Sequence, residues 1–455
     1  MNPSQPKNQK PNIVTAVPGP RSQALRQRED AHIAPGLQGY ALMAGIAVAD
    51  ARGSAITDVD GNTYVDLIGG IAVNALGHSH PTYVKALQDQ VARASVGALT
   101  SEARVELCER LARLTPSPKL HRLQLYSSGA EAVESALRLA KCHTGKHEFV
   151  SFWGGFHGKT MGVLSLMGSR FKEKLGPMLP GSHSVPYADC YRCPLKLAYP
   201  ACSLACVEFA RKQTRMSSAG SIAAVIVEPM QGTSGNVIPP KEFLPAVREM
   251  AHDLGALLIA DEMITGLGRT GRNFGVDHSD VVPDIMTVGK AFGGGFPLSG
   301  IVTTDEISVA KPWSHPSGSS SSYGGNPLGA VAGATALKII ADERLVENSA
   351  QVGTVMLREL EGFVDRYPFV GCVQGAGMFM RIELVKDKAG KEPLPRPVTE
   401  RIFHECVRRG LLTMAYAANF RIQPALTMDE ATAKNGLAVL REVFDLVDRE
   451  RWFAT

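Results

Sequence analysis

Residues 256–271 read ALLIADEMITGLGRTG, and residues 283–300 read PDIMTVGKAFGGGFPLSG. Each stretch contains a short apolar run that ends close to a charged residue, which is Asp261 in the first and Lys290 in the second. Short apolar runs are typical of strands that are buried on both faces of a parallel sheet. Ligands of such sheets bind beyond the carboxyl ends of the strands. We therefore interpret Asp261 and Lys290 as candidates for one ligand site.

The same pattern extends from about residue 80 to residue 330. Short apolar runs alternate there with amphipathic segments, as in LQLY near 123, EFVSF near 148 and AAVIVE near 223. This alternation predicts βαβ units and a mainly parallel sheet with helices on both faces, so the expected fold class is α/β. Beyond residue 330, helices and short strands alternate and predict a smaller α+β domain.

The length of 455 residues exceeds the size at which a single core usually stops growing. We expect an N-terminal arm at 1–35, a segment at 36–80 that joins the small domain, a large ligand-binding domain at 81–330 and a C-terminal small domain at 331–455. The arm lacks periodicity, so we expect it to be mobile or laid on the surface. The stretch GSAITDVDGNTYVDL (53–67) alternates around Asp60-Gly61-Asn62 and predicts a β-hairpin.

The composition favours small-molecule partners. The net charge of +4 arises from 48 basic and 44 acidic residues spread along the chain, which argues against a nucleic-acid partner. We find no apolar run of about 18 residues, and the first residues lead into no apolar signal segment. We therefore expect no membrane partner and a cytoplasmic location.

Two polar turns follow predicted strands. In LQLYSSGAEAVESA, Ser128, Gly129 and Ala130 open a helix, and the backbone N–H groups of a helix N-terminus suit a phosphate. An ordinary capped helix is the alternative. In SFWGGFHGKT, Phe156 and His157 lie in a glycine-rich turn, where a flat ring could stack on the aromatic face, although simple packing is the alternative.

Acidic and amide groups follow two further strands. VIVEPMQG presents Glu228 and Gln231, and a carboxylate that ends a buried strand is costly unless it is paired. A phosphate cradle, a stacking ring, a buried Asp261 and a Lys290 able to form a Schiff base together match the needs of pyridoxal phosphate. The sequence therefore predicts this cofactor.

The ordered motifs resemble the class III aminotransferases of fold type I. These motifs are SSGAEAVESALRLAK, GGFHGKT, VEPMQG, LLIADEMITGLGRTGRNFG, PDIMTVGKAFGGGFPLSG, SYGGNP and FRIQPALT, and the likeness covers roughly residues 35–450. The resemblance is greatest to the 4-aminobutyrate aminotransferase group. It implies a large domain with a mainly parallel sheet and a smaller α+β domain.

The resemblance also implies residue roles. Lys290 would be the catalytic Schiff-base lysine, Asp261 the partner of the pyridine nitrogen, and Phe156 the stacking ring. Ser322, in SYGGNP, would reach the phosphate of the neighbouring subunit, so we expect a homodimer or a dimer of dimers with active sites at the subunit interface. The further cofactor-binding residues would be Ser128, Gly129, Ala130, His157, Glu228, Gln231 and Met263.

Three residues are implied in substrate binding. Arg421, in FRIQPALT, would bind the α-carboxylate of the keto-acid acceptor, with a surface ion pair as the structural alternative. Ile71 would line the substrate site, and Lys159 would face the distal carboxylate of the amine donor. Related enzymes commonly carry Glu at the position of Thr233, where it neutralises the arginine, so Arg421 would here stay open to a carboxylate.

The resulting hypothesis is an aminotransferase that moves an amino group from an ω-amino acid or related amine to 2-oxoglutarate or pyruvate by a ping-pong mechanism. An amino-acid racemase or epimerase of the same family is the first alternative, because the acid at the position of Thr233 is missing. A catalytically silent binding protein is the second alternative, and the intact Asp261, Gln231 and Lys290 argue against it.

Four cysteines cluster in DCYRCPLKLAYPACSLACVEFA, with the spacing Cys190-x2-Cys193-x8-Cys202-x3-Cys206. The pair spacings suit a structural zinc site, although the loop between the pairs is short. The alternative is reduced thiols that pack an insertion, with no metal. In either case we expect a structural and not a catalytic role.

Overall fold

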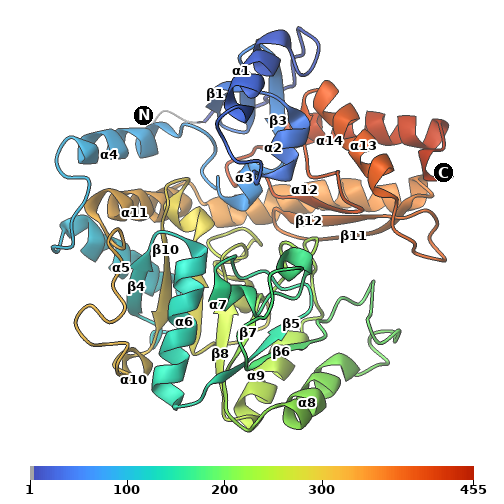
Figure 1. The fold of residues 1–455 in the computed structure, drawn as a ribbon. Helices are drawn as coiled ribbons and strands as arrows, with labels where there is room; N and C mark the ends of the chain where they lie inside the picture. Colours follow the sequence, from blue (N-terminus) through green and yellow to red (C-terminus); the bar gives the residue numbers. More distant parts are fainter. Residues whose placement is uncertain (1–4, 455) are drawn as a thin grey trace. The chain divides into compact units, whose positions relative to one another are not determined.

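The computed structural model describes residues 5–454 and divides the chain into two compact units (Figure 1). The first unit comprises the residues up to Val84 together with those from Arg344 onward, and the second runs from Lys85 to Glu343. No helix in the described part of the chain is long and apolar enough to cross a membrane.

The second unit is built on a seven-stranded sheet with the order β4-β10-β9-β8-β7-β5-β6. Its strands are β4 (Arg122–Tyr126), β5 (Glu148–Phe152), β6 (Ser182–Val185), β7 (Ile222–Val227), β8 (Leu257–Asp261), β9 (Ile285–Val288) and β10 (Ser299–Thr303). The strands from β9 to β6 pair in parallel, whereas β10 is antiparallel to both β9 and β4. The prediction of an α/β fold with a mainly parallel sheet is confirmed.

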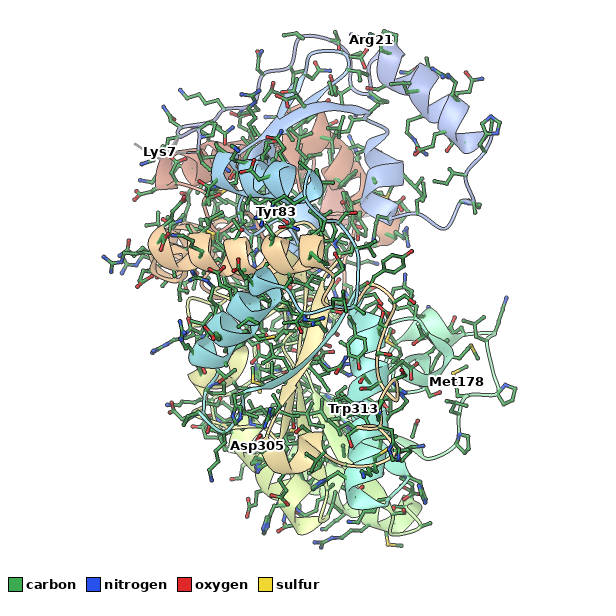
Figure 2. The ribbon with its side chains drawn as sticks, turned by 90° about the vertical axis from the view of Figure 1, so that its left-hand side faces the viewer. Lys7, Arg21, Tyr83, Met178, Asp305 and Trp313 are labelled. Atoms are coloured by element: carbon green, nitrogen blue, oxygen red, sulfur yellow. The ribbon has the colours of Figure 1, made fainter. Side chains whose placement is uncertain are left out.

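Helices cover this sheet because its central strands are mostly apolar, with Asp261 and Thr287 among the exceptions. Every residue of β7, β9 and β10 is buried, as expected where both faces of a sheet are packed. Buried residues of helix α6 belong to the same core cluster as Ile226, Ile259 and Ile285. Trp313 donates a hydrogen bond from its indole Nε1 to Ser135 Oγ on this helix at 2.9 Å (Figure 2). The helices of the second unit are α5 (Glu102–Leu114), α6 (Gly129–Thr144), α7 (Met161–Leu164), α8 (Ala205–Ser217), α9 (Phe243–Asp253), α10 (Asp305–Ser308) and α11 (Pro327–Asp342).

The first unit contains two small sheets. One has the order β1-β2-β3-β13, with β1 (Val48–Arg52), β2 (Ala55–Asp58), β3 (Thr63–Asp66) and β13 (Leu411–Leu412), and the other has β11 (Val370–Ala376), β12 (Phe379–Leu384) and β14 (Asn419–Ile422). The predicted hairpin is confirmed, because β2 pairs antiparallel with β3. The helices of this unit are α1 (Pro20–Asp30), α2 (Gly39–Ala44), α3 (Gly69–Ala72), α12 (Leu345–Arg366), α13 (Arg396–Arg408) and α14 (Glu430–Arg449), while α4 (Pro81–Val91) spans the boundary.

The N-terminal arm contains a helix that its composition did not predict. Helix α1 begins where the Asp60 carboxylate accepts hydrogen bonds of 2.8 Å from the N–H groups of both Arg21 and Ser22. An acid at this position satisfies the free N–H groups of a helix start and complements its dipole. Two backbone hydrogen bonds also join Asn12 to Thr63, so the arm is tied to the hairpin.

Candidate active site

Asp261 lies at the carboxyl end of β8, where its carboxylate is held by three donors. Its side chain is only 1% exposed, and Oδ2 lies 2.7 Å from His157 Nδ1. Oδ1 accepts hydrogen bonds from Thr287 Oγ1 at 3.0 Å and from the N–H of Met263 at 3.1 Å. Burying a carboxylate is costly unless it has such partners, and these three donors hold the Asp261 carboxylate at the end of β8.

His157 is the charged partner of this carboxylate. Burial by itself would lower the pKa of His157, but the hydrogen bond and charge of Asp261 outweigh burial and raise the pKa above its ordinary value. The imidazole therefore favours its protonated form beside Asp261. The sequence predicted His157 as a cofactor contact, and the structure adds that it orients Asp261.

The pair should make stability depend on pH. Since the folded pKa of His157 is raised, its contribution is complete below the ordinary histidine pKa of about 6.5 and is lost as the pH rises through the folded pKa. We expect His157→Gln to destabilise the cofactor-free protein by on the order of 3 kcal/mol at low pH. Thermal unfolding of both proteins between acidic and alkaline pH measures this difference. The exposed His121→Gln serves as the control, and a difference that grows with pH would contradict the charged pair.

Lys290 lies at the same edge of the sheet as Asp261. Thr287, on β9, is the register partner of Asp261 on β8, and Lys290 follows three positions later at the start of the 3-10 turn η3 (Lys290–Gly293). Its φ of 47° is in the left-handed region, which is uncommon for a residue with a side chain and often marks a functional position. The half-buried Lys290 and the buried Asp261 therefore follow the ends of two neighbouring strands.

The start of helix α6 combines a capping box with free N–H groups. Ser128 Oγ accepts from the N–H of Glu131, and Glu131 Oε2 accepts from the N–H groups of Ser127 and Ser128 at 3.0 and 2.9 Å. The N–H groups of Gly129 and Ala130, in the first turn, can have no partner within the helix. An ordinary helix cap and a phosphate-binding site are therefore compatible at this turn, because they use different N–H groups.

Close backbone approaches bring the turns of the site together. A Cβ placed at Gly158, whose φ is +140°, would lie 2.8 Å from the Cβ of Ala130. The sulfur of Met263 would lie 3.1 Å from a Cβ at Gly129 and 2.5 Å from one at Gly289. The aromatic turn therefore meets the α6 start at Ala130, and the α6 start and the lysine turn both approach Met263.

Glu228 organises two loops of the site. Its Oε1 accepts from the N–H of Phe156 and its Oε2 from the N–H of Gly232, both at 2.9 Å. Burial raises the pKa of the Glu228 carboxyl, and the nearby His157 and the two N–H donors offset part of this effect. Tyr187, which the sequence reasoning missed, donates from its hydroxyl to the carbonyls of Glu228 and Pro229 at 3.1 Å each. No local sequence signal distinguishes this tyrosine.

Phe156 and Lys159 both contact a second phenylalanine, Phe171. Phe156 is half-buried and meets the Phe171 ring edge-on, with centroids 5.5 Å apart and an interplanar angle of 77°. The exposed Lys159 lies with Nζ 5.0 Å from the Phe171 centroid, a cation–π contact. Gln231 is buried and donates to the carbonyl of Trp153 at 2.8 Å. Phe171 is exposed, and no local sequence pattern distinguishes it.

Three predicted site residues do not follow strand ends of the seven-stranded sheet. Ser322 is exposed on the loop before α11, and its neighbour Ser321 donates to Glu131 at the α6 start at 3.3 Å. Ile71 and Arg421 belong to the first unit. Ile71 has a φ of +62°, which is strained for a β-branched residue, and Arg421 is half-buried on β14.

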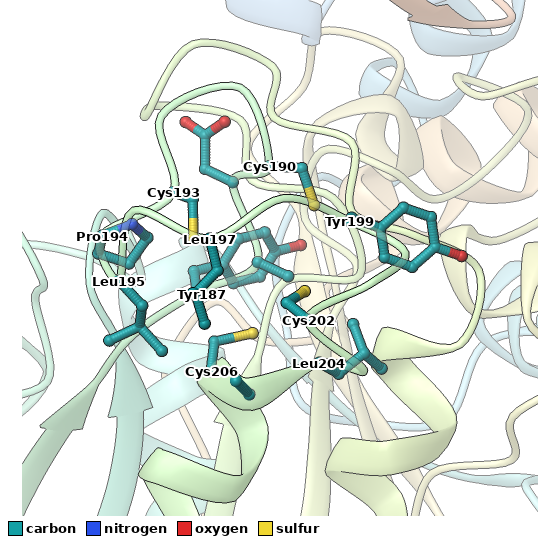
Figure 3. Close-up of a pocket in the computed structure, with 13 residues that line it drawn as sticks. Tyr187, Cys190, Cys193, Pro194, Leu195, Leu197, Tyr199, Cys202, Leu204 and Cys206 are labelled. Carbon is teal, nitrogen blue, oxygen red and sulfur yellow. The ribbon is translucent and has the colours of Figure 1, made fainter.

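The four clustered cysteines line one apolar cavity of about 10 Å³ with Tyr187 and several leucines (Figure 3). Burial and the nearby Cys202, Cys206 and Cys193 raise the pKa of Cys190 to about 11. Within residues 5–454, no group of three or more His, Cys, Asp or Glu side chains is arranged so that it could hold a metal ion.

Comparisons with known proteins identify the family. A family model described as aminotransferase class-III matches residues 38–444. The chain belongs to this family. Among its relatives are a 5-aminovalerate aminotransferase of Pseudomonas aeruginosa, 33% identical over 83% of this chain and 88% of the relative, and a leucine/methionine racemase of Thermococcus litoralis, 32% identical over 84% and 86%.

The solved structure of an amine transaminase from an uncultivated Pseudomonas species, in its PLP-bound form, superposes with a TM-score of 0.85. The two chains are 30% identical in sequence, and the match covers 91% of this chain and 98% of the amine transaminase. The fold of this class-III aminotransferase is therefore that of the PLP-dependent transaminases, it is an enzyme of this class, and its cofactor is pyridoxal phosphate. The residues of the second unit fit that cofactor, because they offer N–H groups for a phosphate, a partly open aromatic ring, an ionised buried acid and an amine at one sheet edge.

Proposed function

We propose that this class-III aminotransferase transfers the amino group of an ω-amino acid or a related amine to 2-oxoglutarate or pyruvate by a ping-pong mechanism. The observation that supports this most is the register of β8 and β9, which pairs Asp261, the partner of His157, with Thr287, three positions before Lys290. Pyridoxal phosphate supplies an electron sink when bound, and the chain must supply attachment, proton transfer and substrate selection.

The chain's own residues divide these tasks. Lys290 holds the cofactor covalently through Nζ and moves the proton at the reacting carbon. Asp261, kept ionised by its three donors, holds the proton on the pyridine nitrogen. Phe156 stacks on the ring, while Gly129 and Ala130 bind the phosphate. Glu228 positions the Phe156 turn, and its two hydrogen bonds support that role.

Substrate selection is assigned to two charged residues. Arg421 binds the acceptor's α-carboxylate, and Lys159 faces the distal carboxylate of the donor. The cation–π contact with Phe171 supports the role of Lys159, because it restricts the ammonium group beside the Phe156 turn. The 5-aminovalerate aminotransferase among the relatives supports a donor whose amine lies far from its carboxylate.

A second copy of the chain completes the proposed enzyme. Leu99 is 87% exposed and Tyr323 is 64% exposed, and Val96 and Val105 are also exposed. Val96, Leu99 and Val105 lie close together in the sequence, and exposed apolar side chains that form one patch suit an interface between proteins. A homodimer or a dimer of dimers would cover them and bring Ser322 toward the phosphate of the neighbouring subunit.

The deciding experiment supplies single donors with or without a keto acid. 5-Aminovalerate, 4-aminobutyrate and diaminobutyrate are each incubated with 2-oxoglutarate or pyruvate, and formation of glutamate or alanine is measured. Transamination requires the keto acid. The racemase relative makes the alternative specific, because a racemase would convert L-leucine or L-methionine to the D form without any keto acid. Racemisation without transfer would refute the proposal.

Arg421→Ala tests the acceptor site. Loss of a charge-assisted partner should cost about 2 kcal/mol or more in acceptor recognition, which is roughly a 30-fold higher KM for the keto acid. The donor half-reaction, followed in a single turnover without keto acid, should change less. Arg366→Ala removes an exposed arginine of the same unit and serves as the control. An unchanged acceptor KM in Arg421→Ala would contradict the role of Arg421 in binding the acceptor's α-carboxylate.

A further inference from the structure

Four consecutive residues of the first unit have a left-handed backbone. The segment labelled α3 in Figure 1 (Gly69–Ala72) is a left-handed turn, in which φ is +55°, +62°, +62° and +61° in chain order. Glycine adopts this conformation readily, whereas Ile71 and Ala72 carry a Cβ that disfavours it, and Ile71 is also β-branched. Such strain persists only where the surroundings over-determine it, and it is concentrated at functional sites.

The Asp66 carboxylate holds the start of this turn. Asp66 is the last residue of β3, and its side chain is buried. Its Oδ1 accepts hydrogen bonds from the N–H groups of Ile68 and Gly69 at 2.8 and 3.0 Å, and its Oδ2 lies 3.1 Å from His78 Nε2. Hydrogen bonds to a charged acceptor are stronger than those between neutral groups. One side chain thus joins the residues that open the left-handed run to a residue beyond its end.

Backbone hydrogen bonds attach both flanks of the turn to the segment that follows β14. The N–H of Gln423 donates to the carbonyl of Leu67 at 2.9 Å, and the N–H of Leu426 donates to the carbonyl of Ala75 at 2.8 Å. A Cβ at Gly69 would lie 2.7 Å from the carbonyl oxygen of Gln423. The turn and this segment are therefore packed directly against each other, and only glycine fits at position 69.

This attachment links the turn to the strand that carries the proposed acceptor residue. Arg421 lies on β14, two positions before Gln423. Ile71 is half-buried, so an apolar side chain in strained backbone is partly open close to that strand. One methylene in an apolar pocket changes the preference between substrates by about 10-fold or more. An isoleucine fixed in this place is suited to discriminate substrates by length.

We propose that Asp66 is a positioning residue that holds the turn 69–72 in its left-handed conformation, so that Ile71 limits the length of the amine donor. The hydrogen bonds of Asp66 to the N–H groups of Ile68 and Gly69 carry this proposal, together with the attachment of the turn beside β14. The inference rests on the proposed function, because the turn is assigned to the substrate through its link to Arg421.

The test measures donor discrimination in the cofactor-loaded enzyme, as the ratio of kcat/KM for 5-aminovalerate to kcat/KM for 4-aminobutyrate. Ile71→Ala shortens the side chain and should shift this ratio toward the longer donor by about 5-fold or more. Asp66→Ala releases the turn and should shift the ratio in the same direction by about 3-fold or more. The double variant Asp66→Ala/Ile71→Ala should shift it no further than Ile71→Ala does, because Asp66 acts on the donor through Ile71.

Two variants separate positioning from stability. Asp66→Asn keeps an oxygen that can accept from both N–H groups, so its ratio should stay within about 2-fold of wild type. Asp60→Ala is the matched control, because the Asp60 carboxylate also accepts from two N–H groups in the first unit. It should lower the temperature of thermal unfolding and leave the ratio unchanged. Cofactor absorbance and thermal unfolding verify that each variant is folded.

Three results would overturn the positioning role. The first is an equal loss of kcat/KM for both donors in Asp66→Ala, which a purely structural residue would give. The second is a double variant in which the two shifts add, and the third is an unchanged ratio in Ile71→Ala although both donors react. If neither donor reacts with either keto acid in the wild-type enzyme, the proposed function fails and this inference fails with it.

Gly70→Ala decides the question if Asp66→Ala does not fold. A Cβ at Gly70 would lie 3.6 Å from Val73 Cβ, which is an ordinary contact, so the substitution mainly adds a disfavoured side chain to the left-handed turn. A ratio that shifts as it does in Ile71→Ala then supports the proposal. An unchanged ratio in a folded Gly70→Ala overturns it.

Discussion

Lys290→Ala is expected to abolish covalent attachment of the cofactor and to lower transaminase turnover by about 10³-fold or more. The reason is that no other amine is assigned to this edge of the sheet, and both attachment and proton transfer depend on Nζ. Reduction with borohydride followed by mass spectrometry of the intact chain measures attachment, and keto-acid-dependent product formation measures turnover.

The matched control is Lys338→Ala, which removes a half-exposed lysine from α11. It should bind cofactor and turn over as wild type does. Partial rescue of Lys290→Ala by small external amines would support the proton-transfer role. Wild-type turnover in Lys290→Ala would show that another residue performs the chemistry.

Asp261→Asn is expected to have the second largest effect. The substitution preserves shape but removes the charge that His157, Thr287 and the Met263 N–H stabilise. Loss of one member of a buried charge pair costs about 3–5 kcal/mol, so we expect kcat to fall by about 10²-fold or more. Steady-state kinetics and the absorbance spectrum of the bound cofactor measure the loss.

Asp277→Asn is the control, because it changes a carboxylate of the same unit that accepts from the N–H of Phe274. Asp261→Glu keeps the charge and should retain more activity than Asp261→Asn. Equal kcat in Asp261→Asn and wild type would contradict the role of this charge.

The sequence predicted those parts of the fold whose signal is local. β7 and β8 are apolar runs bounded by polar turns, so their position was evident. β6 was not predicted, because SHSV is a half-buried edge strand without an apolar pattern. β10 is antiparallel to both of its neighbours, β9 and β4. β4 is distant in the sequence, and a glycine-rich turn separates β9 from β10, so no local pattern predicts this direction.

The same limit applies to the site. Asp261 and Lys290 follow strand ends, so the sequence pattern was enough to select them. The hydrogen bond from Thr287 to Asp261 depends on the register of β8 and β9, which the sequence pattern does not reveal. Tyr187 and Phe171 act through contacts with residues far along the chain, so only the three-dimensional arrangement reveals them. An ordinary cap at the start of α6 was one interpretation of the sequence, whereas the reciprocal hydrogen bonds of Ser128 and Glu131 were not predicted.

The antiparallel β10 has a consequence for the mobility of Lys290. Because β10 runs opposite to β9, it starts at the edge where β9 ends, and Ser299 at its start donates to the carbonyl of Ser128 at 2.6 Å. The segment between β9 and β10 is thus a short loop anchored at both ends. It can adopt far fewer conformations than a long crossover connection could. The amine can exchange partners through its side-chain torsions alone, so amide hydrogen exchange in 290–298 should be slow and insensitive to substrate.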